Sequence, residues 1–478
     1  MPSKRTLGWW LFLLFCTVAT VFGQTDPDAE VVNYPRGAIL DAESYDTLPR
    51  RAFLATRSYE GLPRSFSLKQ YAPLPGDQEN YGTCVAWAAA YAARTIAESV
   101  ALDRRNQTET TQNVFSPVYI YRNIQPDDHD LQRGAQIHWA LDLMRDSGAV
   151  RMLDIERSVD FRRVDVSLYR DSRRYPIGGY VTLFSREDRQ KPALVTRIVK
   201  KSLTEGKPVI IGMNTPDSFL EARNVWQPRE NPENYYGGHA MCVVGYDDER
   251  GAFELLNSWG RKWGNGGFIW VPYRAFVDFV MESYEMIENL ASFSDTVRFE
   301  GFARLEIVDR AGASRQARFT RTPDGYYKAA EVYTEGTQFR FVMGAGENAY
   351  AYTFAVSQPS RDGSLSSPIL LFPQAGVLPL LNYRDSAVIL PGEDNTFSLD
   401  ADAGTEYFIT LYSKQTLDIQ AIMRRFASLR GTLSDRLPKA VGNNFWRTMS
   451  YNENEASFTA QPDDPRAITA LVVAVEHR

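Results

Sequence analysis

The spacing of apolar residues changes twice along this chain, and this limits its fold more than any other feature. From residue 84 to 205 the signals are helical, with capping residues at the starts and glycines at the ends. From residue 207 short apolar runs are broken by Gly, Asn and Asp, which is typical of strands. Beyond residue 296 the period is mostly two. The sequence therefore predicts an α+β domain with a helical half and a strand-rich half, followed by a mostly β domain.

The same signals predict the individual elements. Helices are expected over 84–102, 117–124, 135–147, 193–205 and 417–429. The strands of the first part are expected in KPVIIGM, HAMCVVGYD, AFELLN and GFIWVPY. A chain of 478 residues is too long for one small core, so more than one domain is expected. We expect four segments: a signal peptide over 1–23, a short polar segment over 24–61, the α+β domain over 62–296 and a β-rich accessory domain over 297–478.

The first residues resemble an export signal. Lys4 and Arg5 precede an apolar run from Leu7 to Phe22, and small residues stand just before Gln24. An uncleaved membrane anchor is the alternative, but the run is at the short end for a membrane span. We therefore expect cleavage before Gln24 and a secreted or periplasmic protein that is not bound to a membrane once the signal has been removed.

Charge and cysteine content exclude some classes of protein. The net charge of −6 argues against a nucleic-acid partner, which would require a basic face. The cysteines are Cys16, Cys84 and Cys242, and loss of the signal would leave only the last two. A disulfide framework is therefore not expected to hold the fold, and Cys242 reads as a packed residue of a buried strand.

Cys84 is the candidate nucleophile. It follows the turn residue Gly82 and the expected helix cap Thr83, so it falls in the first turn of an alanine-rich helix. Unsatisfied backbone N–H groups and the positive end of the helix dipole favour a thiolate there. A packed core cysteine is the alternative that this position alone leaves open.

Residues that could assist such a thiolate stand elsewhere in the chain. His239 follows a Gly-Gly turn at the start of a buried strand, and Asn257 could accept its ring N–H and fix its orientation. Trp259 could shield that contact from water. Gln78, six residues before Cys84, could join the Cys84 backbone N–H in an oxyanion hole.

These residues together resemble the papain-like cysteine peptidases. The similarity covers residues 62–290, and NSWGRKWGNGGFIWVP is its most specific piece. His239 and Asn257 follow Cys84 by 155 and 173 residues, in the order that the family shows. The resemblance implies a two-lobed domain, with a helical lobe and a β-barrel-like lobe, and hydrolysis of peptide bonds in peptide or protein substrates without a cofactor or a metal.

The resemblance also implies a role for each residue. Cys84 would be the nucleophile, His239 its base and Asn257 the residue that orients His239, with Gln78 in the oxyanion hole. Gly134 and Ala135, in RGAQIHWAL, would line the non-primed side of the substrate cleft, and Trp259 would cover the histidine.

This sequence departs from the family at several points. Val85 follows the cysteine where the family usually has Trp, and Tyr81 and Arg133 stand where disulfide-bonded cysteines are normal, which fits a disulfide-free, bacterial-type branch. Residues 24–61 are too short for the usual helical prodomain, so any latency must come from that short segment or from elsewhere.

Two other functions stay open. Another Cys-His enzyme, such as a transglutaminase or an acyltransferase, would usually orient its histidine with Asp, and a non-catalytic protein of the same fold would not need all of these residues. The C-terminal part resembles an uncharacterised β-rich domain found beside bacterial secreted peptidases and kinases, and its ligand is unknown. DADAGTE does not fit a calcium loop, because Leu411 stands where the twelfth-position Glu is required. The acidic PDDHD (126–130) is expected to be a solvated loop.

Overall fold

A computed structural model describes residues 34–52, 54–288, 297–383, 386–452 and 455–478. The expected signal peptide and the expected boundary at 296 lie outside these ranges, so both stay predictions. Residues 35–478 form one compact unit. No helix in the described ranges has the length and apolar character needed to cross a membrane.

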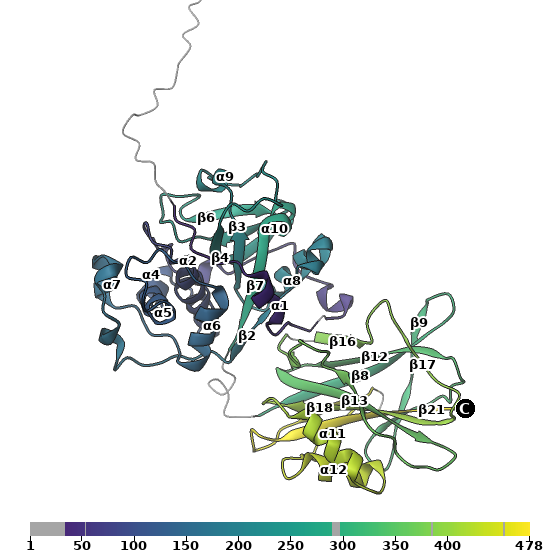
Figure 1. Ribbon diagram of the computed structural model, residues 1–478. Coiled ribbons are helices and arrows are strands. Elements are labelled where there is room, and N and C mark those ends of the chain that lie inside the picture. The colour runs from purple at the N-terminus through teal and green to yellow at the C-terminus, as the bar shows by residue number, and fades with distance from the viewer. Residues whose placement is uncertain (1–33, 53, 289–296, 384–385, 453–454) are drawn as a thin grey trace, which may run out of the picture. The chain divides into compact units, whose positions relative to one another are not determined.

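The helical lobe is built around the helix that begins at Cys84. It runs through α2 (Cys84–Ala86), η3 (Trp87–Arg94) and α3 (Thr95–Ala101), close to the predicted 84–102, and η3 has π-helical hydrogen bonding that the sequence did not indicate. Every residue of η3 is buried, because its alanines allow close packing on all sides. The other helices of the lobe are α4 (Gln107–Gln112), α5 (Pro117–Ile124), α6 (Ile137–Asp146) and α7 (Asp154–Ser158), and of these α5 and α6 contact it directly (Figure 1).

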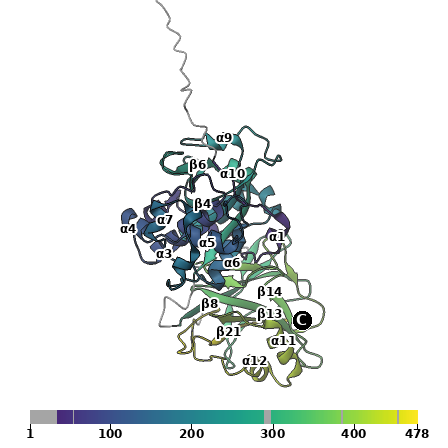
Figure 2. The ribbon, with the colours of Figure 1, turned by 60° about the vertical axis from the view of Figure 1, so that its left-hand side comes forward.

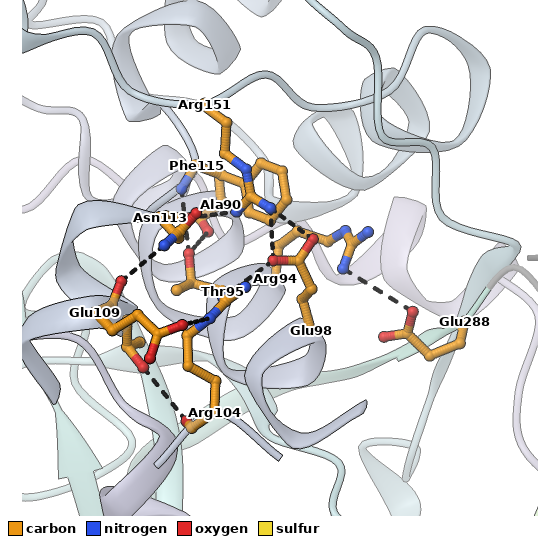
Figure 3. A network of polar contacts seen from close by, with 11 residues as sticks. Ala90, Arg94, Thr95, Glu98, Arg104, Glu109, Asn113, Phe115, Arg151 and Glu288 are labelled. Atoms are coloured by element: carbon orange, nitrogen blue, oxygen red, sulfur yellow. Dashed lines mark hydrogen bonds and ion pairs between the residues drawn. The ribbon is translucent and has the colours of Figure 1, made fainter. Parts of the chain in front are cut away.

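A network of ion pairs fixes the far end of this helix (Figure 3). Glu98 accepts hydrogen bonds from Arg151 Nη2 at 2.6 and 2.8 Å and from Arg104 Nη1 at 3.3 Å. Arg94 lies 3.9 Å from Glu288 at the end of the β lobe. Since these charged groups are largely buried, each needs its partner, and the network holds the helix in one position relative to both lobes.

The β lobe is one antiparallel sheet in the order β2-β7-β3-β4-β5-β6, with β1 paired to β4. The predicted strand runs correspond to β3, β4, β5 and β6, and α8 starts one residue before its predicted range. The elements are β1 (Ser65–Ser67), β2 (Gly179–Thr182), α8 (Pro192–Thr204), β3 (Val209–Asn214), β4 (Gly238–Asp247), β5 (Ala252–Leu256), β6 (Phe268–Pro272), α10 (Tyr273–Phe279) and β7 (Val280–Ile287). Short α1 (Ala42–Thr47) and α9 (Asp217–Leu220) lie outside the sheet.

The C-terminal part consists of two packed sheets, as its period of two predicted. One has the order β10-β11-β21-β18-β13-β14, with β15 on β13. Its strands are β10 (Phe319–Arg321), β11 (Tyr327–Ala329), β13 (Ala349–Pro359), β14 (Ile369–Phe372), β15 (Leu380–Leu381), β18 (Gly404–Ser413) and β21 (Ile468–His477). The other has the order β16-β12-β8-β20-β19, with β17 on β12 and β9 on β8. Its strands are β8 (Phe299–Val308), β9 (Ser314–Gln316), β12 (Gln338–Ala345), β16 (Ser386–Leu390), β17 (Phe397–Ser398), β19 (Ser450–Tyr451) and β20 (Ser457–Ala460). Phe341 and Phe408 stack between the sheets at 4.8 Å.

Two helices cover the outer face of the first of these sheets (Figure 2). They are α11 (Ile419–Ser428), predicted over 417–429, and α12 (Leu433–Val441), which the sequence did not predict because Pro438 normally breaks a helix. The buried side chains of both helices share one core with β13, β18 and β21. The α+β fold class and the mostly β C-terminal part are therefore confirmed.

Candidate active site

Cys84 begins α2, at the junction of the two lobes. Thr83 occupies the N-cap position, but its hydroxyl makes no capping hydrogen bond, which corrects the expected role of that residue. The Cys84 Sγ accepts the backbone N–H of Ala240 at 3.4 Å, and Ala240 directly follows His239 on β4. The predicted thiol and imidazole are thus brought together by the packing of α2 against β4.

His239 is held by the two residues that the sequence analysis assigned to it. Its Nε2 lies 2.7 Å from Asn257 Oδ1, and its ring stacks on Trp259 with centroids 4.3 Å apart. Its Nδ1 is buried without a hydrogen-bond partner. Since Asn257 Oδ1 is an acceptor, it favours the tautomer with hydrogen on Nε2, which leaves Nδ1 free to accept a proton.

Gln78 is completely buried beside this group. Its Oε1 accepts the hydroxyl of Ser258 at 2.6 Å, and its Nε2 donates to the carbonyl of Tyr81 at 2.7 Å and to that of Pro35 at 3.3 Å. The amide is therefore held at both its oxygen and its nitrogen. One of its N–H groups points to the carbonyl oxygen of Tyr81, which lies just before the helix that begins at Cys84.

Gly134 is positioned by Tyr121 and Asp128, a pair of residues that the sequence analysis did not single out. Gly134 has φ +74°, a conformation that favours glycine, and its N–H donates to Tyr121 Oη at 3.0 Å. Tyr121 in turn donates to Asp128 at 2.6 Å. Asp128 is 1 % exposed, so the expectation of a solvated PDDHD loop is wrong at this residue. Because the backbone of Ala135 forms an isolated bridge with Ala38, α6 begins at Ile137 instead of the predicted 135.

The cleft between these residues is occupied by residues 35–40, which we call the strap. Ala38 N–H donates to Gly238 O at 3.0 Å, and Ala135 N–H donates to Gly37 O at 2.9 Å. The carbonyl of Ala135 does not accept a hydrogen bond from Gly37. Instead, Ile39 N–H donates to Ala135 O at 2.9 Å. This is a parallel bridge between Ala38 and Ala135. The polar segment that the sequence left without structure thus contacts Gln78 and Ala135 and pairs with Gly238, next to His239.

The fit of the strap depends on close backbone contacts. A Cβ built on Gly37 would lie 2.0 Å from the carbonyl oxygen of Gly82, and one on Gly134 would lie 2.4 Å from Gly37 O. Arg36 donates to Tyr236 O at 2.8 Å and pairs with Asp217. No side chain larger than hydrogen fits at position 37 unless the strap moves.

The chain that follows the strap is held on both sides. Arg51 N–H donates to Thr182 O at 3.0 Å, and Arg50 N–H donates to Gly376 O of the C-terminal part at 2.8 Å. The Arg51 side chain pairs with the completely buried Glu285. The strap is thus continuous with a segment that both parts of the protein contact.

Burial under the strap decides the charge of the site. It raises the pKa of the Cys84 thiol to about 11, although backbone N–H groups, Gly37 among them, oppose the shift. It lowers the pKa of His239 to about 4, against the effect of the Asn257 hydrogen bond. Burial therefore opposes the thiolate that the helix position favours, because desolvation destabilises the charged form of the thiol. The described residues contain no group of three metal-binding side chains.

Comparison with known proteins agrees with this geometry. Residues 180–286 match the family described as papain family cysteine protease, a range that holds His239, Asn257 and Trp259 but not Cys84. The chain therefore contains a papain-like cysteine peptidase domain. An uncharacterised peptidase C1-like protein of Acanthamoeba polyphaga mimivirus is 27% identical over 261 residues, which are 48% of this chain and 72% of that protein. Cathepsin K of Gallus gallus is 31% identical over 110 residues, 22% of this chain and 30% of its own length. Xylellain, a cysteine protease from Xylella fastidiosa, has 21% identity and a TM-score of 0.41, over 54% of this chain and 99% of its own.

Proposed function

We propose that this peptidase cleaves peptide or protein substrates with Cys84 as nucleophile and His239 as base, after export from the cell. The observation that carries the proposal is the state of His239: Asn257 and Trp259 fix its ring, its Nδ1 has no hydrogen-bond partner, and Cys84 Sγ lies 3.4 Å from the backbone N of the next residue, Ala240. This arrangement has the parts that an activated thiol requires, a base and a residue that orients the base. Gly134 and Ala135 would then bind the substrate backbone.

Gln78 supplies the electrophilic part of the mechanism. Its Nε2 already donates to the carbonyl of Pro35, so it can donate in the same way to the oxygen of a substrate carbonyl that Cys84 attacks. The attack would leave a negative charge on that oxygen, with the thiol proton on His239 and then on the leaving amine. An acyl-enzyme on Cys84 would form, and water would release it.

The strap keeps this site latent. It excludes water from Cys84 and His239, both fully buried, and holds them neutral. It also runs opposite to the direction that the family resemblance implies for a substrate, since the residues after Gly37 lie along Gly134 and Ala135. A segment in this direction fills the cleft without presenting a peptide bond in the orientation for attack.

A single substitution in the full-length chain tests both parts of the proposal. Gly37→Ala places a Cβ 2.0 Å from Gly82 O and should displace the strap. We expect an epoxysuccinyl thiol-protease inhibitor to label Cys84 at least 10-fold faster in this variant than in the parent, with matching hydrolysis of an unstructured protein. Peptide mapping identifies the labelled cysteine. Ile39→Ala is the control, since this side chain is 38% exposed and its removal leaves the backbone contacts in place.

Two results would count against the proposal. Hydrolysis that persists in Gly37→Ala/Cys84→Ala would exclude Cys84 as nucleophile and favour a binding protein of this fold with a contaminating activity. Equal labelling in the parent and in Gly37→Ala would exclude the strap as the cause of latency, but not the peptidase. Export is tested separately by sequencing the mature N-terminus, which we expect at Gln24.

A further inference from the structure

The loop of residues 128–134 leads into the cleft, and its backbone conformation needs support. Leu131 has φ +59°, which is costly for a residue with a side chain, and the loop ends at Gly134. Such a conformation persists only where the surrounding structure holds it. No disulfide holds this loop, because both cysteines that the structure describes, Cys84 and Cys242, are free. Hydrogen bonds must therefore fix the loop.

Asp128 collects the hydrogen-bond donors of this loop. Its Oδ1 accepts the backbone N–H of Gln132 at 3.3 Å, and its Oδ2 accepts that of Arg133 at 2.9 Å. The same Oδ2 accepts the hydroxyl of Tyr121 at 2.6 Å. Burial opposes ionisation of Asp128, but the hydrogen bonds from these three residues hold its pKa below the ordinary value. Asp128 is thus a buried carboxylate whose donors come from the loop and from α5.

Tyr121 connects this carboxylate to the cleft. Its side chain is buried in α5, and its hydroxyl oxygen accepts the N–H of Gly134 at 3.0 Å. Because the hydroxyl hydrogen is donated to Asp128, the oxygen presents its lone pairs to Gly134. Gln125, at the end of the same helix, donates to the carbonyl of Gly134 at 2.7 Å. Both polar groups of the Gly134 backbone are thus held from α5, and those of Ala135 pair with the strap.

We propose that Tyr121 and Asp128 are positioning residues for the backbone of Gly134 and Ala135, so that Ala135 can pair with whichever extended segment fills the cleft. The inference rests on the proposed function. Without the Tyr121 hydroxyl, Gly134 N–H loses its acceptor and Asp128 loses one of its three donors. The strap and a substrate should then both bind more weakly, with opposite consequences. A weaker strap exposes Cys84, whereas weaker substrate binding raises KM.

Tyr121→Phe in the otherwise unchanged full-length chain tests the effect on the strap. We expect iodoacetamide to alkylate Cys84 about 10-fold faster than in the parent, the size expected for one buried hydrogen bond. Cys242 should stay unreactive, and it reports on unfolding, since it is completely buried in β4. Tyr91→Phe is the matched control, because it removes another buried tyrosine hydroxyl of the helical lobe, one that donates to Leu74 O at 2.7 Å.

The same substitution in the Gly37→Ala background tests the effect on a substrate. We expect KM for an unstructured peptide to rise about 10-fold while kcat changes by less than about two-fold. Asp128→Asn should act in the same direction. The double variant Tyr121→Phe/Asp128→Asn should be no worse than the more severe single variant, because the two residues act through one contact. Tyr91→Phe should leave both kinetic constants unchanged.

Three results would overturn the inference and leave the peptidase assignment intact: equal effects of Tyr121→Phe and Tyr91→Phe, faster alkylation of Cys84 and Cys242 together, or a loss of kcat at constant KM. If Gly37→Ala hydrolyses no peptide although its Cys84 is alkylated, the proposed function itself fails. Alkylation needs no turnover, so it still decides the inference in that case. Selective alkylation of Cys84 in Tyr121→Phe would support it, and an unchanged rate would overturn it.

Discussion

Gln78 donates its two side-chain N–H groups to two carbonyls, and only one of the two belongs to the strap. The bond to Tyr81 O, together with the hydroxyl of Ser258 on its Oε1, keeps the amide in place when the strap leaves. The other N–H is then available to a substrate. A structural role for Gln78 would depend on the first bond, and a catalytic role on the second.

Gln78→Ala in the Gly37→Ala background separates these roles. Loss of one oxyanion donor typically lowers kcat by about 10²–10³, so we expect that loss with an unchanged rate of Cys84 alkylation. The measurement is a comparison of steady-state turnover with inhibitor labelling. Gln132→Ala is the control, because this exposed side chain also donates to a backbone carbonyl, that of Asn80. Full turnover in Gln78→Ala would disprove the oxyanion role.

The residues of the candidate site differ in how far the sequence could predict them. Cys84, His239, Asn257 and Trp259 stand in contiguous motifs with a set order, so their proximity could be expected. Asp128 could not, because an aspartate in PDDHD reads as solvated and becomes buried only through the Tyr121 contact. The strap has no apolar period at all, and most of the hydrogen bonds that hold it are backbone bonds, which leave no mark in the sequence.

At the scale of elements, α5 shows how one side chain can serve two purposes. Ser116 Oγ accepts the N–H of Tyr119 as the helix cap and donates to Glu156 at 2.6 Å. The cap and Pro117 made this helix predictable to the residue. The position of Glu156 could not be predicted, because its segment carries no such signal. Its Oε1 accepts the Ser116 hydroxyl, and its Oε2 is buried without a hydrogen-bond partner. The π-helical turn of η3 was equally unpredictable, because it reflects packing on every side and not a local preference.

Glu156→Gln should change how stability depends on pH. Burial raises the pKa of Glu156 to about 8, so the folded protein keeps a proton that the unfolded chain loses above pH 4.5. The stability that this retained proton contributes is fully present below pH 4.5. As the pH rises toward 8, the free energy of unfolding falls by up to about 1.4 kcal/mol per pH unit. We therefore expect the variant to gain stability relative to the parent between pH 5 and pH 8. Urea unfolding at both values measures it, and a constant difference would contradict the raised pKa.

At the scale of the whole molecule, buried polar contacts cross the expected boundary near residue 296. Tyr383 Oη donates to Glu285 and lies 2.6 Å from Ser202 Oγ, while Lys207 Nζ donates to Asn382 O at 2.7 Å. Burial opposes ionisation of Glu285, but Arg51 and Lys207 hold its pKa below the ordinary value. The change from helical to alternating pattern indicated where the second core begins. It could not indicate that Arg51 and Tyr383 meet at one buried carboxylate, that of Glu285.

Arg51→Met should therefore be strongly destabilising. It leaves Glu285 buried without its closest cation, and breaking a buried ion pair from one side costs about 3–5 kcal/mol. The free energy of unfolding in urea measures the loss. Arg315→Met removes a half-exposed partner of Glu331 and serves as the control, with an expected change within about 1 kcal/mol. Equal effects of the two substitutions would show that the buried cluster contributes no more than a surface pair.

The strap and the cleft belong to one chain, and this would make the proposed inhibition independent of how dilute the protein is. A tethered segment acts at an effective concentration that for short linkers is on the order of millimolar, so even weak backbone contacts keep the cleft filled. A single cut between Leu40 and Arg50 would turn the strap into a free peptide. Dilution then disperses it, and six residues with few side-chain contacts would not rebind at ordinary concentrations. Opening without a cut is reversible, whereas opening by a cut is permanent.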